Sequence, residues 1–294
     1  MKMARVAGLV LLLVAQAAPA AGEFFDDFSQ TSLQGLRDAG WTLREAAGHP
    51  GVPGARWQPE ALSLQREGPT TLLRLEGHTD GTPAGTQQAQ LCHQRKVLRG
   101  TYAARVRFGN RPLEGAGGDP VIQSFFAVAP LRHDFDPRFS EIDWEYLAQG
   151  GWGSPETRLY AITWQTVRLE PWEAHNAAHE EKRRFEGWHT LVTQVRPDGQ
   201  THWWVDGRRV ARHGGRNQPV EPMAIAFSLW FSPGGLPPPS AQPRRWAMEV
   251  DWVFHAAGRT LAPAEVERQV RRWQRQGVAQ RDTLPPGPAA RCDF

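Results

Sequence analysis

Residues 139–147, Phe-Ser-Glu-Ile-Asp-Trp-Glu-Tyr-Leu, alternate acidic and apolar side chains, and this alternation constrains the fold of the 294-residue chain more than any other segment. In an extended strand successive side chains point to opposite faces, so Glu141, Asp143 and Glu145 share one face. The three intervening apolar residues share the other face. The segment therefore predicts a strand with one face in a core and an acidic face directed away from it.

The acidic face has two interpretations. Three neighbouring carboxylates raise the pKa of at least one of them, which leaves one carboxyl protonated and another ionised near neutral pH. Glycoside hydrolysis needs that division, because one acid protonates the leaving oxygen while a carboxylate attacks or activates water. Polar and apolar residues also alternate on an ordinary solvated face of an antiparallel sheet. The spacing alone leaves both interpretations open.

The rest of the chain, to about residue 257, consists of short apolar or alternating runs separated by Gly, Pro, Asp and Asn. This pattern favours an all-β sandwich over a helical fold. Strands are expected at 71–75, 101–108, 121–128, 189–195, 202–205 and 223–231.

The C-terminal segment has a different pattern. A helix is predicted to begin at Pro263, with Val266, Val270 and Trp273 on one face, and to stop at Gly277. The Pro-Pro-Gly-Pro sequence that follows cannot continue a helix and predicts an extended tail.

The N-terminus predicts export. Lys2 and Arg5 precede an apolar run over residues 6–14 and a small-residue cleavage site, which is typical of a signal peptide over residues 1–20. The run is too short to span a bilayer, so no membrane partner is expected and the protein should be secreted or periplasmic. The domains expected after the peptide are a catalytic domain over 21–258 and a C-terminal helix with a Pro-rich tail over 259–294.

The charge of the chain limits the kinds of partner that it can bind. The chain has 34 Lys and Arg residues, two of them in the leader, against 31 Asp and Glu residues, and its arginines form no basic stripe. This balance does not indicate a nucleic-acid partner.

Cys92 and Cys292 are the only cysteines, and both a disulfide and two unpaired thiols remain open. His175 and His179 have a spacing that binds a metal on a helix, but they lie in a predicted polar loop, where solvated histidines are favoured.

The sequence Glu-Ile-Asp-Trp-Glu at 141–145 resembles the Glu-x-Asp-x-Glu signature of glycoside hydrolase family 16, which includes laminarinases, lichenases, agarases and carrageenases. Further segments are similar to family motifs in the same order along the chain: 24–28, 40–42, 98–106, 123–126, 187–190, 197–199, 204–207, 228–231 and 250–253. The resemblance implies a concanavalin-like jelly roll of two antiparallel sheets, one of them curved to form a groove.

The resemblance also implies roles for the acidic residues. Glu141 maps onto the nucleophile, Glu145 onto the general acid and base, and Asp143 onto an assistant that tunes both. These roles imply an endo-acting, retaining hydrolase of a β-linked glucan or galactan. Four residues of strand separate the Cα atoms of Glu141 and Glu145 by about 13 Å. Their carboxyl groups must therefore lean together over a curved sheet to reach the about 5 to 5.5 Å of retaining enzymes.

Sugar rings present apolar faces, so aromatic rings commonly form the floor of glycan grooves. Phe139 shares the parity of the acids, and the resemblance maps Phe126 and Trp230 onto groove-facing positions. Ser124 and His189 are expected to donate hydrogen bonds there. Both the groove and the core remain open for five further tryptophans: Trp152, Trp164, Trp172, Trp203 and Trp204.

Two features limit what the resemblance implies. Residues 159–163 and Ser228 replace asparagines that the family often has, which leaves the identity of the sugar open. Asp251 matches a position that in some relatives helps to hold a structural calcium ion, and no other cofactor is implied. The expected partner is a polysaccharide, and the protein should be a monomer. A transglycosylase on the same scaffold and a non-catalytic carbohydrate-binding protein are the alternatives.

Overall fold

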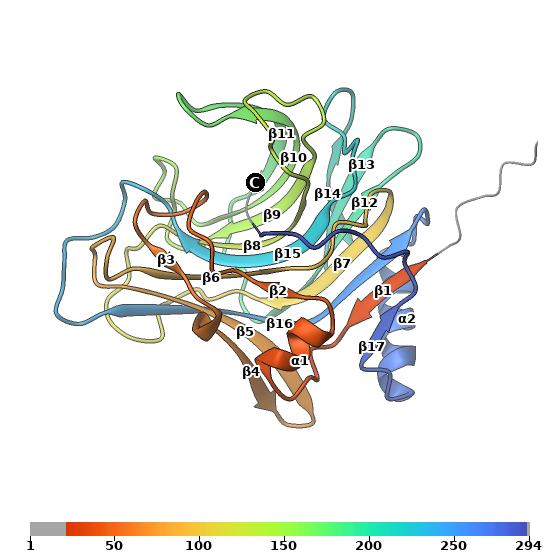
Figure 1. Ribbon diagram of the computed structural model, residues 1–294, viewed down its shortest axis with the longest axis horizontal. Coiled ribbons are helices and arrows are strands. Elements are labelled where there is room, and N and C mark those ends of the chain that lie inside the picture. The colour runs from red at the N-terminus through yellow and green to blue at the C-terminus, as the bar shows by residue number, and fades with distance from the viewer. Residues whose placement is uncertain (1–21, 293–294) are drawn as a thin grey trace, which may run out of the picture.

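The computed structural model describes residues 22–292, which form two stacked β-sheets with helices outside them (Figure 1). The signal peptide predicted over residues 1–20 lies outside the described residues. No helix within residues 22–292 is long and apolar enough to cross a membrane.

One sheet is antiparallel and carries the acidic strand near its middle. Figure 1 shows that it curves upward at β10 and β11, so that its outer face is concave. Its order is β2 (Thr42–Leu43), β6 (Gln87–Cys92), β15 (Ala224–Phe231), β8 (Val121–Val128), β9 (Glu141–Leu147), β10 (Arg158–Arg168) and β11 (Glu173–Glu181).

The second sheet covers the convex side of the first. Its order is β4 (Leu62–Glu67), β5 (Thr70–Thr79), β16 (Arg244–Ala257), β7 (Gly100–Arg107), β12 (Trp188–Val195), β13 (Thr201–Val205) and β14 (Arg208–His213). β1 (Glu23–Asp26) pairs with the C-terminal half of β16, and β17 (Gln280–Asp282) pairs with β1. The two sheets join where β3 (Arg56–Trp57) runs parallel to β6 and where β5 meets β6.

The predicted all-β jelly-roll sandwich is confirmed. Five of the six predicted strands match observed strands within one residue at each end, and the strand predicted over 71–75 extends over Thr70–Thr79. Two short elements escaped prediction, the helix α1 (Leu33–Asp38) and a 3-10 turn at Pro59–Ala61. Each is too short to leave a periodic apolar pattern.

The apolar face of β9 lies in the core between the sheets, as its alternation predicts. Ile142, Trp144 and Tyr146 are buried. The indole Nε1 of Trp144 donates a hydrogen bond of 2.9 Å to Thr193 Oγ1 on the other sheet, and its ring packs edge-on against Trp203 at 5.0 Å. These contacts fix which face of β9 points outward.

The predicted C-terminal helix is confirmed as α2 (Pro263–Arg275). Its apolar residues, Val266, Val270 and Trp273, are buried against the outer face of the second sheet. The Trp273 ring lies 5.0 Å from the ring of Phe25. Gly277, with φ of 66°, follows the end of the helix.

The loop predicted around His175 and His179 is wrong, because both residues lie on β11. Glu, His, Asn and Ala have little strand propensity, but pairing with β10 satisfies the backbone of this edge strand. His175 hydrogen-bonds to Glu173 and His179 to Glu181. Residues 22–292 contain no group of three side chains suited to a metal ion.

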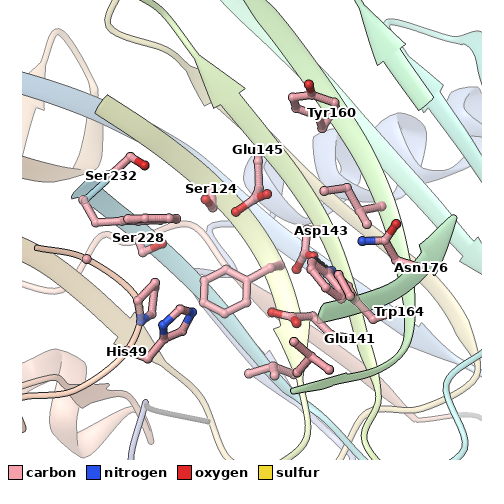
Figure 2. A pocket seen from close by; sticks show the side chains of 18 of the residues that line it. His49, Ser124, Glu141, Asp143, Glu145, Tyr160, Trp164, Asn176, Ser228 and Ser232 are labelled. Atoms are coloured by element: carbon pink, nitrogen blue, oxygen red, sulfur yellow. Dashed lines mark hydrogen bonds between the residues drawn. The ribbon is translucent and has the colours of Figure 1, made fainter. Parts of the chain in front are cut away.

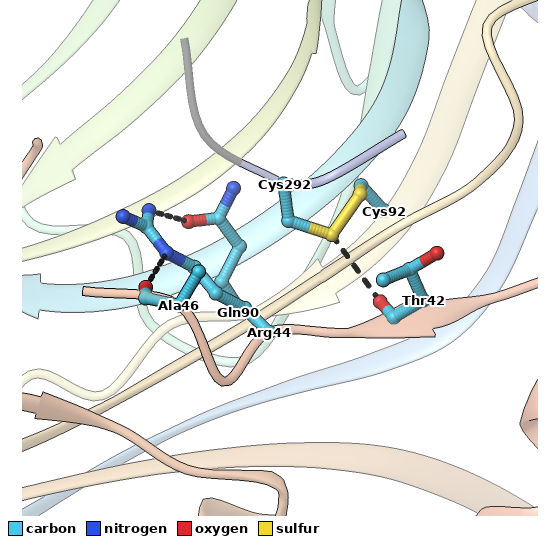
Figure 3. The surroundings of a disulfide bond; sticks show 6 residues. All are labelled: Thr42, Arg44, Ala46, Gln90, Cys92 and Cys292. Carbon is cyan, nitrogen blue, oxygen red and sulfur yellow. Dashed lines mark hydrogen bonds between the residues drawn. A yellow bond between two sulfur atoms is a disulfide. The ribbon is translucent and has the colours of Figure 1, made fainter. Parts of the chain in front are cut away.

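The C-terminal tail packs on the same core. Its residues form β17, bury Leu284 and end at a disulfide between Cys92 and Cys292, whose Cα atoms lie 5.5 Å apart (Figure 3). The choice between a bridge and two thiols, which the sequence left open, is thereby decided in favour of the bridge.

Candidate active site

Strand pairing places the three acids in the middle of the concave face. Each acid of β9 lies directly between one residue of β8 and one residue of β10. From Glu145 to Glu141, the β8 partners are Ser124, Phe126 and Val128, and the β10 partners are Tyr160, Ile162 and Trp164. All nine residues line one cavity of about 580 Å³. The alternation of β9 therefore ends in a hollow, which excludes the interpretation as a solvated face.

The cavity extends over β15 and β6, where Ser228, Trp230 and Gln90 continue its floor. Figure 2 shows Ser124 and Ser228 on one side of the acids, with Trp164 and Asn176 on the other. The lining combines aromatic rings with hydroxyl and amide groups, the composition expected for a ligand with apolar faces and polar edges.

Burial is the main cause that raises the pKa of Glu141 and Asp143 well above the usual carboxyl values. The negative charge of Glu145 adds to this effect at Glu141, and the charge of Glu141 adds to it at Asp143. Asp143 donates a hydrogen bond to Glu141, which favours the ionised form of Glu141 and the protonated form of Asp143. The indole Nε1 of Trp164 donates to Asp143 Oδ2 and fixes that carboxyl in place. Of the two, Glu141 is the better nucleophile.

Glu145 lies beyond Asp143 on the same face. Burial and the charge of Asp143 raise its pKa well above the usual value, which favours a protonated carboxyl. Across the strand, the buried Ser124 Oγ makes no hydrogen bond to any residue of the described chain. A protonated acid and an unpaired hydroxyl thus face the same space, and both can interact with an oxygen of a bound ligand.

The structure brings three predicted binding residues, Ser124, Phe126 and Trp230, to the cavity with the acids. Phe139 does not line the cavity, because it precedes β9 and the alternation does not extend to it. It is buried against Val128 and packs on Phe126. Phe139 therefore packs against lining residues of the cavity without lining it.

His189 lies on β12, in the second sheet, and is absent from the cavity lining. Its Nδ1 lies 2.7 Å from Asp206 Oδ2, and the ring of Phe185 packs against it. The resemblance identified the strand correctly, but β12 belongs to the sheet that does not line the cavity.

Asp251 lies on β16 and accepts a hydrogen bond of 2.7 Å from Arg105 Nη1. Its other oxygen, Oδ1, is buried without a partner among the described residues. Calcium takes six to eight oxygen ligands, from carboxylates, backbone carbonyls and water, and the structural calcium ion expected at Asp251 stays a prediction.

The structure adds residues that the sequence did not single out, among them Tyr160, Gln90, Asn176 and His49. It also places the five tryptophans for which the sequence left both the groove and the core open. Trp152, Trp164 and Trp172 line the cavity, Trp203 lies in the core, and Trp204 packs near α2. Tyr160 and Trp164 of β10 pair with Glu145 and Glu141 of β9. Knowing how the β9–β10 hairpin aligns its two strands would therefore have placed both residues on the acidic face. No comparable pattern marks His49, which lies in a loop.

No family model matches this sequence, and no curated protein matches it. Solved structures do resemble the fold. The β-glucanase of Bacillus licheniformis aligns with a TM-score of 0.59 at 16% identity, covering 80% of this chain and 98% of that one. A family 16 endo-glucanase from Bacteroides ovatus aligns with a TM-score of 0.58 at 14% identity, covering 78% and 98%. The κ-carrageenase of Pseudoalteromonas carrageenovora aligns with a TM-score of 0.53 at 16% identity, covering 84% and 99%. The chain therefore has the fold of the glycoside hydrolase family 16 enzymes.

Proposed function

We propose that this protein is a glycoside hydrolase that cleaves a β-linked glucan or galactan within the chain and retains the anomeric configuration. The observation that carries the proposal is the row of three acids, Glu141 and Asp143 buried and Glu145 half-buried, that faces an aromatic cavity on the concave sheet. The fold supports it, since the similar structures are named as glucanases and a carrageenase. The signal peptide predicted over residues 1–20 supports an exported enzyme.

In the first step of the proposed reaction, the Glu141 carboxylate attacks the anomeric carbon of the sugar. Glu145 gives its proton to the glycosidic oxygen, so that the bond to the leaving sugar breaks. Asp143, hydrogen-bonded to Glu141, holds the attacking carboxylate in position. The raised pKa of Glu145 keeps the required proton available near neutral pH.

In the second step, Glu145 is ionised and removes a proton from water. The resulting hydroxide attacks the same anomeric carbon from the side of the departed sugar and releases Glu141. Two displacements at one carbon restore the starting configuration. Another sugar hydroxyl in place of water would give transglycosylation.

The lining of the cavity favours an uncharged glycan. It contains three acids and, among the described residues, no Lys or Arg. A sulfated or carboxylated chain would meet negative charge here without a compensating cation. Phe126, Trp164 and Trp230 can instead pack against the apolar faces of neutral sugar rings.

A panel of linear and branched β-glucans, galactans and sulfated galactans, incubated with the native protein, tests this proposal. Glu141→Gln is expected to abolish the release of reducing ends from at least one neutral glycan, whereas the exposed Glu60→Gln leaves that release unchanged. Proton NMR of the first product should find the β-anomer before mutarotation. Transfer to an added acceptor would favour the transglycosylase, and binding without cleavage across the panel would favour a binding protein.

A further inference from the structure

Two segments from opposite edges of the curved sheet meet above the cavity. Residues 44–55 connect β2 with β3, and both of these strands pair with β6. Residues 169–172 form the turn between β10 and β11 at the other edge. Four strands, β15, β8, β9 and β10, lie between β6 and β11. A contact between the two segments therefore has to cross the concave face.

His49 of the loop and Trp172 of the turn make this contact. Their ring planes are inclined by 22°, and the ring centroids lie 5.8 Å apart. Both residues line the cavity that holds the acids. Trp172 also packs edge-on against Trp164, the neighbour of Glu141 across the strand. The stacked pair therefore bridges the cavity on the side of Glu141.

The loop side of the bridge is fixed in place. The buried Arg44 donates hydrogen bonds to the carbonyl oxygens of Ala46 at 2.9 Å and His49 at 3.0 Å. Its Nη1 donates to Gln90 Oε1 at 2.7 Å, which ties the loop to the cavity floor (Figure 3). The guanidinium also lies 4.1 Å above the ring of Trp57. The hydrogen bond from Arg44 to its carbonyl oxygen thus holds the backbone of His49 in place.

Trp172, on the turn between β10 and β11, has fewer contacts to hold its side chain. Trp172 is 54% exposed, and its ring packs against His49 and Trp164. The turn itself is held by the ion pair of Arg168 and Glu173, at 2.6 Å. Any opening of the bridge therefore involves the indole of Trp172 rather than the loop.

We propose that His49 and Trp172 form a clasp across the cleft that selects linear, unbranched β-glycan chains and excludes chains with sugar branches on the units beneath it. This inference rests on the proposed function and specifies its substrate class. An unbranched chain presents no side group to the stacked rings, so it can lie on the floor at Phe126, beside the contact of Trp172 with Trp164. A branch projecting from the chain has to displace the stacked rings.

A branched β-1,3-glucan and its linear product, made by periodate oxidation and removal of the branches, provide a matched pair of probes. The native protein should cleave the linear polymer with the higher kcat/KM. His49→Ala and Trp172→Ala should each lower the ratio of linear to branched kcat/KM about tenfold, the scale of steric discrimination in a binding site. The change should arise from a lower KM for the branched polymer, and Trp172→Phe should retain most of the native ratio.

Trp152→Ala is the matched control. Trp152 is another exposed tryptophan of the cavity, but it packs on Tyr160, beside Glu145, and takes no part in the clasp. Its loss should lower kcat/KM for both polymers by a similar factor. An unchanged ratio in both alanine variants of the clasp would overturn the inference.

Binding separates a failure of the clasp from a failure of the proposed function. In the Glu141→Gln background, calorimetric titration with linear and branched oligosaccharides from the same polymers measures discrimination without cleavage. A preference for linear chains that disappears in Glu141→Gln/Trp172→Ala supports the clasp even if the native protein cleaves nothing. Cleavage by the native protein with no such preference refutes the clasp alone, and binding of neither oligosaccharide refutes both.

Discussion

Glu141 and Asp143 share a hydrogen bond in a buried position, and burial raises the pKa of both carboxyl groups. The unfolded chain has no such effect, so the folded state holds protons at these sites to higher pH than the unfolded state. Their contribution to stability is therefore fully present below the usual carboxyl pKa and is lost as pH rises through the raised values. Ionising the acid row thus lowers the stability of the fold at neutral pH.

Glu141→Gln should therefore stabilise the protein at pH 7. Removing one buried charge is expected to increase the free energy of unfolding by about 1 kcal/mol, which corresponds to roughly 2–4 °C in Tm for a domain of this size. The gain should shrink toward pH 4, where the native carboxyl is protonated as well. Urea unfolding of both proteins at the two pH values measures it, and a less stable variant at pH 7 would contradict the account.

Asp143→Asn should move the alkaline limb of the pH profile of kcat/KM to lower pH. Once Asp143 ionises at high pH, its charge helps to raise the pKa of Glu145, so removing that charge favours the ionised form of Glu145. The expected displacement is about one pH unit. Profiles of the native protein, Asp143→Asn and Glu60→Gln on one neutral glycan measure it, and a limb that stays in place or moves upward would refute the coupling.

At the scale of the element, β9 is the strand that its sequence predicted most fully. Its period of two residues predicted which side chains face the core and which face outward, because a one-residue slip would have buried the acids in the core. The same reasoning placed Val266, Val270 and Trp273 on the buried face of α2. β11 was missed because its ladder partner, rather than its own residues, makes it a strand.

Trp273→Ala tests the role of α2 as a support on the convex sheet. The variant should lose about 3–5 kcal/mol of stability, because the buried indole packs against Phe25 and Phe254. KM for the preferred glycan should stay within twofold, since α2 lies on the opposite side of the sandwich from the cavity (Figure 1). The exposed Arg271→Ala on the same helix should cost less than about 1 kcal/mol. Equal losses in the two variants would contradict the packing argument.

At the scale of the whole molecule, the disulfide connects the tail with the curved sheet that carries the acids. Cys92 lies on β6, and Cys292, 200 residues later, lines the cavity. The sequence could not decide this pairing, because residue spacing does not report the distance between two Cα atoms. The contact of His49 with Trp172 escaped prediction for the same reason, since it joins two segments that no local pattern relates.

Replacing both cysteines by serine should lower the free energy of unfolding by up to about 5 kcal/mol, because the bridge closes a loop of 200 residues. KM for a polymeric substrate should rise as well, since the tail forms part of the cavity wall. Urea unfolding and steady-state kinetics of the double variant measure both effects. Unchanged values of both would mean that the tail holds its position without the bridge.

The central claim is that Glu141 forms a covalent bond to the anomeric carbon of a β-glycan. A 2-deoxy-2-fluoro glycoside of the preferred sugar with a dinitrophenolate leaving group tests it directly. The fluorine slows both formation and release of the glycosyl-enzyme, whereas the good leaving group accelerates formation alone, so the intermediate accumulates. Peptide mass spectrometry of the treated protein should find one added fluoroglycosyl group, on Glu141. An adduct on a different residue, or hydrolysis of the preferred glycan with inversion and no adduct, would contradict the account.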